Sequence, residues 1–184
     1  MRVITGSAKG RHLITTKGNR IRPTSERIKE ALFSILGNKV VDSVFVDCFA
    51  GTGAIGIEAL SRGAKKCYFI DNHPESLELI KKNLQITDLL NRSKIISKNI
   101  VSGIREISSY CQKIDIIFLD PPYLKGFIQP TLLEIININI LHPSSLIIVE
   151  HSKKDFLKDQ EGLYCLQQRI YGNTVLSFFM KEEN

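Results

Sequence analysis

From residue 44 onward, short apolar segments alternate with amphipathic ones, and this alternation restricts the fold more than any other feature of the sequence. Runs of strand length occupy 44–47, 67–71, 94–97, 114–120 and 145–150, and segments with helical spacing lie between them at 54–63, 74–85, 101–108 and 129–138. Strands and helices in alternation predict a mostly parallel sheet covered by helices on both faces. Two further apolar runs, 164–172 and 174–180, predict an antiparallel pair and bring the sheet to seven strands.

The first 40 residues differ from the rest of the chain in charge. They contain nine Lys or Arg and two Glu, a net +7, whereas the whole chain carries +6. Short strands and turns are expected over 1–22, followed by an amphipathic helix within 22–36 that Thr24 or Ser25 caps and Gly37 ends. We therefore predict a basic N-terminal extension, 1–40, that docks on an RNA phosphate backbone, and a second unit at 41–184. A solvated basic face explains the charge as well.

Composition excludes several classes of protein. The 184 residues are enough for one domain with a full core. No apolar run approaches the ~18 residues of a membrane helix, and the first residues lack the apolar core of a signal peptide. The cysteines and histidines are widely spaced, which predicts no metal site and no disulfide framework. We expect a cytoplasmic protein and take a monomer as the default state.

A glycine-rich loop follows the first predicted strand. Asp47 precedes it, and the glycines stand at 51, 53 and 56. Glycines let the chain turn tightly and let backbone amides approach a ligand without a Cβ in the way. A dinucleotide would also fit this spacing, but an acid at Asp47 would repel a pyrophosphate and attract the amino group of a methionine moiety. A strand-to-helix turn with no ligand is the simpler alternative.

A second acid ends the next strand, 24 residues further on. Asp71 stands where a carboxylate accepts hydrogen bonds from ribose hydroxyls. One ribose and an aminoacyl tail together indicate S-adenosylmethionine. The third strand leads to Asn99, whose amide oxygen can accept from an adenine amino group, although an exposed turn Asn is an equal alternative. The residues expected to bind the cofactor are Asp47, Phe49, Ala50, Gly51, Gly53, Asp71, Asn72 and Asn99.

Asp120-Pro121-Pro122-Tyr123 follows the fourth predicted strand, on the other side of the glycine-rich loop. An exocyclic amine of a base is a poor nucleophile, and two acceptors for its hydrogens, the Asp120 carboxylate and the Pro121 carbonyl, favour the pyramidal nitrogen that attacks a methyl group. Proline fixes φ and thereby aims that carbonyl, and Tyr123 offers a face on which the base stacks. These four residues are the predicted catalytic set. Without the loop upstream, the same residues would indicate only a turn.

Beyond these features the sequence resembles the RsmD-type 16S rRNA guanine-N2 methyltransferases over nearly its whole length. The resemblance rests on 2–13, 21–36, 47–64, 118–123 and 171–179. It implies a Rossmann-like class I methyltransferase fold, S-adenosylmethionine as donor, and the N2 amine of a guanine in 16S rRNA as acceptor, within an assembled or assembling small subunit. It also makes Arg11, Arg22, Thr24 and Arg27 candidate RNA-binding residues. Asn99 departs from the acid that the family often carries there.

Three other functions remain open at this point. An adenine-N6 DNA methyltransferase would use the same Asp-Pro-Pro-Tyr motif, but 184 residues leave no room for a domain that reads DNA sequence. An NAD-dependent oxidoreductase would use the three glycines, but no acid–base pair for hydride transfer is evident. A non-catalytic RNA-binding assembly factor would have no need of Asp47, Asp71 and Asp120.

Overall fold

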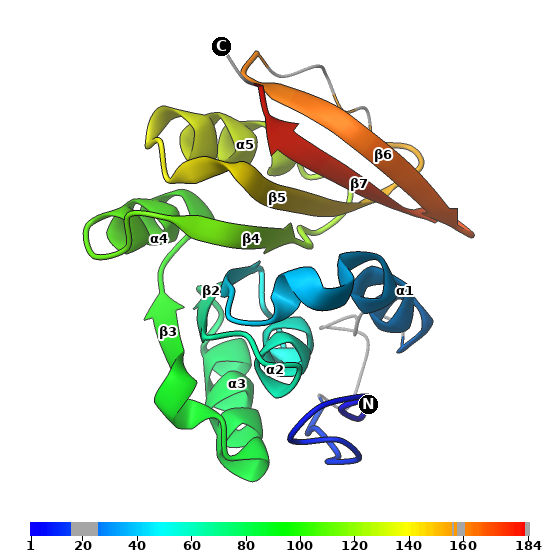
Figure 1. The fold of residues 1–184 in the computed structure, drawn as a ribbon, viewed down its shortest axis with the longest axis vertical. Coiled ribbons are helices and arrows are strands. Elements are labelled where there is room, and N and C mark those ends of the chain that lie inside the picture. Colours follow the sequence, from blue (N-terminus) through cyan, green and yellow to red (C-terminus); the bar gives the residue numbers. More distant parts are fainter. Residues whose placement is uncertain (16–25, 156, 158–160, 183–184) are drawn as a thin grey trace.

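One sheet organises the computed structural model, which describes residues 1–15, 26–155, 157 and 161–182. Its strands are β1 Val44–Cys48, β2 Lys66–Asp71, β3 Ser93–Ser97, β4 Ile114–Leu119, β5 Leu141–Ser152, β6 Leu163–Tyr171 and β7 Thr174–Lys181. Their order is β3-β2-β1-β4-β5-β7-β6 (Figure 1). The first five pair in parallel, whereas β7 pairs antiparallel with both β5 and β6. The predicted seven-stranded, mostly parallel sheet is confirmed.

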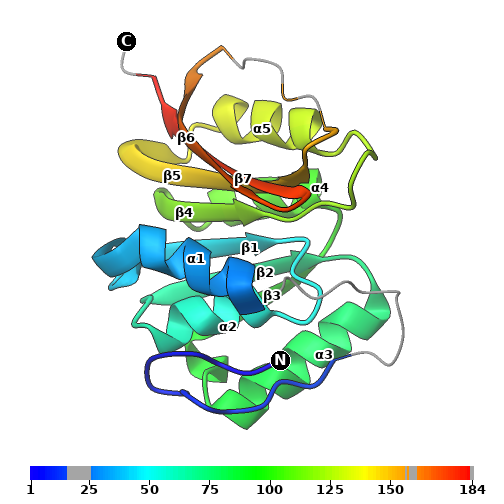
Figure 2. The same cartoon turned by 90° about the vertical axis from the view of Figure 1, so that its right-hand side faces the viewer.

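Helices cover both faces of this sheet. They are α1 Glu26–Leu36, α2 Ala54–Ser61, α3 Pro74–Thr87, α4 Ile100–Ser108 and α5 Ile128–Asn137, with short 3-10 turns at Gly37–Val40 and Leu90–Arg92. One core lies under α1, α2 and α3 and includes Leu32, Leu60 and Ile80. The other lies under α4 and α5 and includes Ile104 and Leu132. Figure 2 shows the sheet between these layers.

Most predicted boundaries agree with the structure to within two residues. The short strands expected over 1–22 are not formed in the described part, 1–15, which contains one isolated bridge between Arg2 and His12. The fifth strand was expected at 145–150 but extends over Leu141–Ser152, because its first residues continue the ladder beside β4, where Ile114 faces Leu141. The first helix ends at Leu36, as Gly37 predicts, but the chain continues for one 3-10 turn before β1. The expected helix caps, Thr24 and Ser25, lie outside the described residues.

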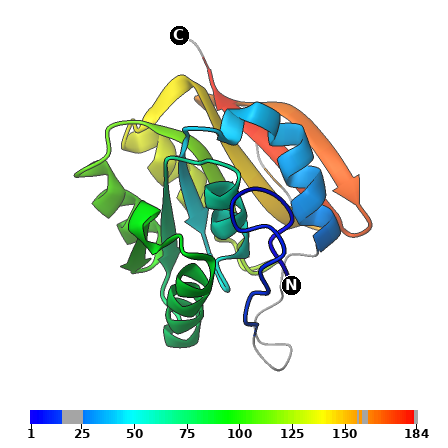
Figure 3. The ribbon, with the colours of Figure 1, turned by 60° about the horizontal axis from the view of Figure 1, so that its bottom comes forward.

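The N-terminal residues 1–15, which we call the strap, fold over α2 (Figure 3). An antiparallel bridge joins Arg2 to His12, and Val3, Ala8 and Leu13 are buried in the core under α1, α2 and α3. The strap thus shares a core with the rest of the chain. Residue 40 is therefore not a boundary between separate cores. That residues 1–40 dock on RNA stays a proposal.

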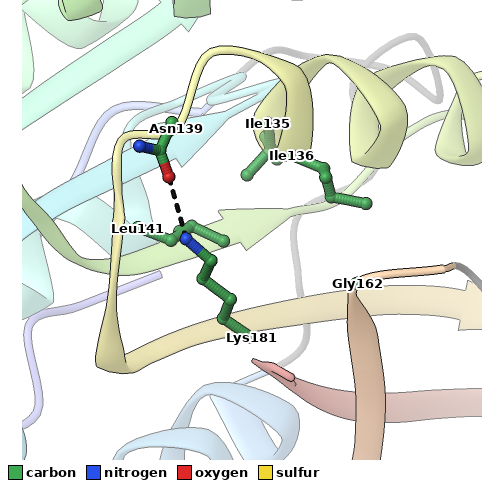
Figure 4. A pocket seen from close by; sticks show the side chains of 6 residues that line it. All are labelled: Ile135, Ile136, Asn139, Leu141, Gly162 and Lys181. Atoms are coloured by element: carbon green, nitrogen blue, oxygen red, sulfur yellow. Dashed lines mark hydrogen bonds between the residues drawn. The ribbon is translucent and has the colours of Figure 1, made fainter. Parts of the chain in front are cut away.

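A small pocket lies at the edge of the sheet where β5 begins (Figure 4). Ile135, Ile136, Leu141 and Gly162 line it, and Lys181 Nζ donates a hydrogen bond to Asn139 Oδ1 at 2.8 Å across it. This edge is opposite to the carboxyl ends of the parallel strands. Within the described ranges, no helix has the length and apolarity needed to cross a bilayer.

Candidate active site

Three carboxylates meet at the carboxyl ends of adjacent parallel strands. Asp47 lies near the end of β1, Asp71 ends β2, and Asp120 follows β4. Strand β1 pairs with β2 on one side and with β4 on the other, so the chain order reverses at β1. The backbone N–H of Asp120 donates to Cys48 O at 3.4 Å, which continues the β1–β4 ladder to the acid. This is the position at which open parallel sheets bind ligands.

The glycine-rich loop joins β1 to α2 in a conformation that few residue types adopt. Phe49, Gly51 and Gly53 have φ of 59°, 55° and 77°, all in the left-handed region. Gly56 is required for a different reason. A Cβ there would lie 2.3 Å from Phe69 Cε1 and 2.6 Å from Cys67 Sγ, so its absence lets α2 pack directly on β2.

Three side chains from different elements hold this loop. Asp71 Oδ2 accepts from Gly51 N at 2.9 Å, and Asp47 Oδ2 accepts from Gly56 N at 2.8 Å. Asn83 Nδ2 donates to Thr52 O at 2.9 Å. The loop is therefore shaped before any ligand arrives, which lowers the ordering cost of binding.

Burial and the neighbouring negative charges strongly shift the pKa of the Asp47 carboxyl. Its side chain is 2% exposed, and burial raises the pKa of its carboxyl well above the usual range. The hydrogen bond from Gly56 N opposes this shift, while the negative charges of Asp120 and Asp71 add to it. A cationic group near Asp47 would offset both the cost of burying its negative charge and the repulsion from Asp71 and Asp120. The site therefore favours a positively charged ligand atom.

The other predicted cofactor residues differ in their surroundings. Asp71 is half-buried, and its Oδ1 also accepts from His73 N at 2.9 Å. Each carboxylate oxygen has a second lone pair that can accept from a hydroxyl. Asn72 is exposed, and Ala50 is buried inside the loop. Asn99 is the N-cap of α4, where its Oδ1 accepts from Ser102 N at 3.0 Å, so a contact with adenine would share an oxygen that already caps a helix.

The Asp-Pro-Pro-Tyr segment lies next to the loop. The ring of Phe127, which follows the segment, packs against the ring of Phe49 at 5.6 Å between centroids. Asp120 and Tyr123 are half-buried, Pro121 is buried and Pro122 is exposed. The hydroxyl of Tyr123 donates to Glu150 Oε1 at 3.2 Å and lies 3.1 Å from Thr174 Oγ1. The residues predicted to be catalytic and those predicted to bind the cofactor thus lie close together at the carboxyl ends of β1, β2 and β4.

The candidate RNA-binding residues are described only in part. Arg11 is exposed in the strap, and Arg27 is exposed in the first turn of α1. The helix α1 begins at the same edge of the sheet as the ends of β1 and β4 (Figure 2). Arg22 and Thr24 lie outside the described residues. Among the residues that the structure describes, no cluster of His, Cys, Asp or Glu could hold a metal ion.

Sequence reasoning missed Asn83, Phe127, Glu150 and Thr174. Asn83 and Glu150 are 0% and 3% exposed, and each is a polar residue placed among apolar ones. A buried polar side chain needs a partner, so such positions in a predicted helix or strand were the available signal. Their partners are distant in sequence, 69 residues for Asn83 with Ile14 and 27 for Glu150 with Tyr123.

Comparison with known proteins agrees with this geometry. The family model described as Conserved hypothetical protein 95 matches residues 1–180. Ribosomal RNA small subunit methyltransferase D of Haemophilus influenzae is 32% identical, over 94% of this chain and 89% of its own length. The protein of that name from Buchnera aphidicola, of the pea-aphid strain APS, is 33% identical over 83% and 78%. "Putative rRNA methyltransferase YlbH" of Bacillus subtilis is 32% identical over 98% and 99%.

A solved structure extends the agreement to the fold. The one titled "Putative methyltransferase yhhF" from Escherichia coli superposes with a TM-score of 0.84 and 28% identity, over 99% of this chain and 98% of that one. The match includes the strap, the loop and the Asp-Pro-Pro-Tyr segment, because it spans almost every residue of both chains. The chain therefore belongs to the RsmD-type ribosomal RNA methyltransferase family.

Proposed function

We propose that this protein transfers a methyl group from S-adenosylmethionine to the exocyclic N2 amine of a guanine in 16S rRNA, within the assembled or assembling small ribosomal subunit in the cytoplasm. The observation that carries the proposal is that the Asp-Pro-Pro-Tyr segment begins beside the strand that leads into the glycine-rich loop, where Asp120 N donates to Cys48 O and where burial, together with the charge of Asp120, raises the pKa of Asp47. The names of the relatives support rRNA as the class of substrate.

The residues around the loop fit this cofactor. Asp47 is a buried carboxyl with a raised pKa, which the ammonium group of a methionine moiety would return toward its ordinary value. Asp71 ends β2, and its carboxylate oxygens retain lone pairs for two ribose hydroxyls. Gly51 and Gly53, with φ of 55° and 77°, give the loop the left-handed turns that would carry its backbone around the ligand. Asn72 and Asn99 would lie beside the adenine.

The bound cofactor supplies an electrophilic methyl group on a sulfonium. The protein would position the guanine and stabilise the charge that develops on its amine. Asp120 and the carbonyl of Pro121 would accept the two hydrogens of the guanine amine, which localises the lone pair on nitrogen. The Asp120 carboxylate also stabilises the positive charge that develops on this nitrogen, so a stronger base is unnecessary. Tyr123 would stack on the guanine once the base is turned out of its RNA helix or loop.

Methyl transfer to small ribosomal subunits from cells lacking this protein tests the proposal. The wild type and Asp120→Ala are incubated with labelled S-adenosylmethionine, and the rRNA is digested to nucleosides. We expect N2-methylguanosine with the wild type and background with the variant. Methylated adenine in a parallel incubation with DNA would favour the DNA methyltransferase, and S-adenosylhomocysteine binding without transfer to either substrate would favour an assembly factor. Tight NAD binding without S-adenosylhomocysteine binding would indicate an oxidoreductase.

A further inference from the structure

Asn83, in the middle of α3, joins two parts of the molecule that are far apart in the sequence. Its Oδ1 accepts from Ile14 N at 2.7 Å, and its Nδ2 donates to Ile14 O at 3.0 Å. The same Nδ2 donates to Thr52 O, in the glycine-rich loop, at 2.9 Å. The Asn83 side chain is 0% exposed, and its bond to Thr52 is buried away from competing water, whereas its two bonds to Ile14 are partly buried. Asn83 therefore bridges the strap and the loop.

Other side chains hold the strap without reaching the loop. Glu58 accepts from Ile4 N at 2.8 Å and Thr5 N at 3.0 Å, and Ser61 Oγ accepts from Ala8 N at 3.0 Å and donates to Thr5 O at 2.6 Å. These residues lie on α2 and bind strap backbone at residues 4–8. They provide a comparison, because their loss would loosen the strap while the bond between Asn83 and Thr52 stays in place.

The bond to Thr52 acts on a single peptide plane of the loop. Asn83 holds the carbonyl oxygen of the Thr52–Gly53 peptide, and the N–H of the same peptide donates to Ala50 O at 2.7 Å. A peptide bond is planar, so fixing both ends fixes its orientation. If the carbonyl is released, the bond to Ala50 O alone orients this peptide, and Gly53, with φ of 77°, has no Cβ to restrict its rotation. The turn that faces the ligand thus depends on the Asn83 amide.

The two bonds to Ile14 in turn fix the Asn83 amide. An Asn side chain has two rotatable bonds, and its terminal one is broad and soft. Ile14 N requires the amide oxygen on the strap side, and this leaves Nδ2 directed between Ile14 O and Thr52 O. If residue 14 leaves, both the flip of the amide and its rotation become accessible. The loop then loses one of the three side chains that hold it, while Asp71 and Asp47 keep their bonds.

We propose that Asn83 is a positioning residue that makes cofactor affinity depend on the docking of strap residue 14. The inference rests on the proposed binding of S-adenosylmethionine at the glycine-rich loop. An RNA-facing segment and the cofactor loop would then share one hydrogen-bonded side chain, and binding at either end would be linked to order at the other. The cofactor site in this chain would include residues of the strap as a functional part.

The test measures S-adenosylhomocysteine binding by titration calorimetry on the full chain. Asn83→Ala removes the side chain that bridges the strap and the loop. Ile14→Pro removes the backbone N–H that orients the Asn83 amide, and the side chain of Ile14 is 42% exposed, so its replacement disturbs little packing. Loss of one or two neutral hydrogen bonds predicts a rise in Kd of roughly three- to thirtyfold for each variant. The double variant should bind no more weakly than the weaker single variant, because both changes interrupt the same connection.

Ser61→Ala is the matched control. It removes a buried strap contact at residue 8 and a partly buried one at residue 5, and it leaves Ile14, Asn83 and Thr52 unchanged. Its thermal midpoint should fall, while its Kd stays within about twofold of the wild type. In steady-state assays Asn83→Ala and Ile14→Pro should raise KM for S-adenosylmethionine and leave kcat at saturation near the wild-type value, a split that general loss of stability does not produce.

Each outcome decides a different question. Wild-type Kd in both variants would overturn the inference while leaving the proposed function in place, and so would additive effects in the double variant. An equal rise of Kd in Ser61→Ala would replace the Asn83 connection with general loosening of the strap. If Asn83→Ala does not fold, the Kd of Ile14→Pro compared with that of Ser61→Ala still tests whether docking of residue 14 controls cofactor affinity. A wild-type protein that fails to bind S-adenosylhomocysteine would instead count against the proposed function.

Discussion

The hydroxyl of Tyr123 is bonded to Glu150, at 3.2 Å from Oε1, on the neighbouring strand of the sheet. Glu150 is 3% exposed, and Leu119 of β4 is in register with Val149 of β5, so the residues that follow, Asp120 and Glu150, come next to each other. Thr174, on β7, holds the same hydroxyl at 3.1 Å. Two strands thereby fix the hydroxyl end of the ring that we propose as the surface for the target base.

The first prediction separates the ring of Tyr123 from its hydroxyl. Tyr123→Ala removes the stacking surface, worth about 1–3 kcal/mol, so kcat/KM on unmodified subunits should fall roughly five- to 150-fold. Tyr123→Phe keeps the ring and loses the hydroxyl contacts to Glu150 and Thr174, which do not touch the base, so its loss should be smaller, roughly three- to tenfold. Thr174→Val tests one anchor alone and should be milder still. Equal activity of Tyr123→Ala and the wild type would remove the stacking role.

The second prediction concerns Asp120. Asp120→Ala should lower kcat by about 10²–10³-fold, because it removes the group that stabilises charge on the amine. S-adenosylhomocysteine affinity should stay within a few-fold, since Asp120 serves the acceptor and its charge only adds to the raised pKa of Asp47. Single-turnover methyl transfer and calorimetry measure the two quantities. A variant that retains full transfer would exclude the proposed mechanism.

The sequence predicts the central strands of the sheet well, because of where they lie in the fold. Strands β1, β2 and β4 are buried on both faces, so they appear as apolar runs such as 114–119. The hairpin of β6 and β7 was also evident. Its insertion, with β7 against β5 and β6 at the edge, was not, because that choice depends on packing between Leu176 and the core of the sheet and leaves no local pattern.

The same reasoning applies to the site. Asp47, Asp71 and Asp120 could be predicted because the ends of neighbouring parallel strands always meet at one edge. Asn83 and Glu150 could not, since their roles depend on groups that only the folded chain brings near them. Asn99 shows a third case. The Asn99 side-chain oxygen caps α4 by accepting from Ser102 N. The prediction that this oxygen contacts adenine did not include the capping role.

The third prediction is a pH dependence that Asp47 controls. Because burial raises its pKa well above the ordinary 3.8, the free protein keeps the proton over a range in which an exposed Asp would have lost it. Binding of an ammonium group favours the ionised carboxylate and releases that proton. Affinity for S-adenosylhomocysteine should therefore rise with pH through this range, and stability of the free protein should fall.

Asp47→Asn provides the comparison for that pH dependence. The amide oxygen still accepts from Gly56 N, but the side chain no longer titrates, so binding should be weaker and its pH slope smaller. Stability of the variant should change less with pH over the same range. Calorimetry in buffers of different ionisation enthalpy counts the protons released on binding. An unchanged Kd in Asp47→Asn at neutral pH would contradict the proposed contact with the amino group.

The fourth prediction concerns a buried ion pair beneath the strap. Lys29 Nζ lies 3.2 Å from Glu58 Oε2, and both side chains are 0% exposed. Burial lowers the pKa of Lys29, and Glu58 opposes this change. Glu58→Ala removes the partner of a buried ammonium and the acceptor of two strap amides, so the free energy of unfolding should fall by about 3–5 kcal/mol. Urea unfolding measures it, and Glu78→Ala, on the exposed side of α3, should leave it unchanged within the error of the measurement.

The last prediction tests whether the basic N-terminal residues bind RNA. Arg11 and Arg27 are exposed, one in the strap and one at the start of α1. If each contacts a phosphate, replacing it by Gln should weaken subunit binding and lower the slope of log K against log salt by about 0.7–0.9 per contact. Lys113→Gln is the control, because this exposed residue precedes β4 at the edge of the sheet opposite to Asp120. Filter binding between low and moderate salt gives the slopes. If Arg11→Gln and Arg27→Gln keep the wild-type slope, the positive charge at these two positions is only a solvated face, and RNA must reach Asp120 across another surface.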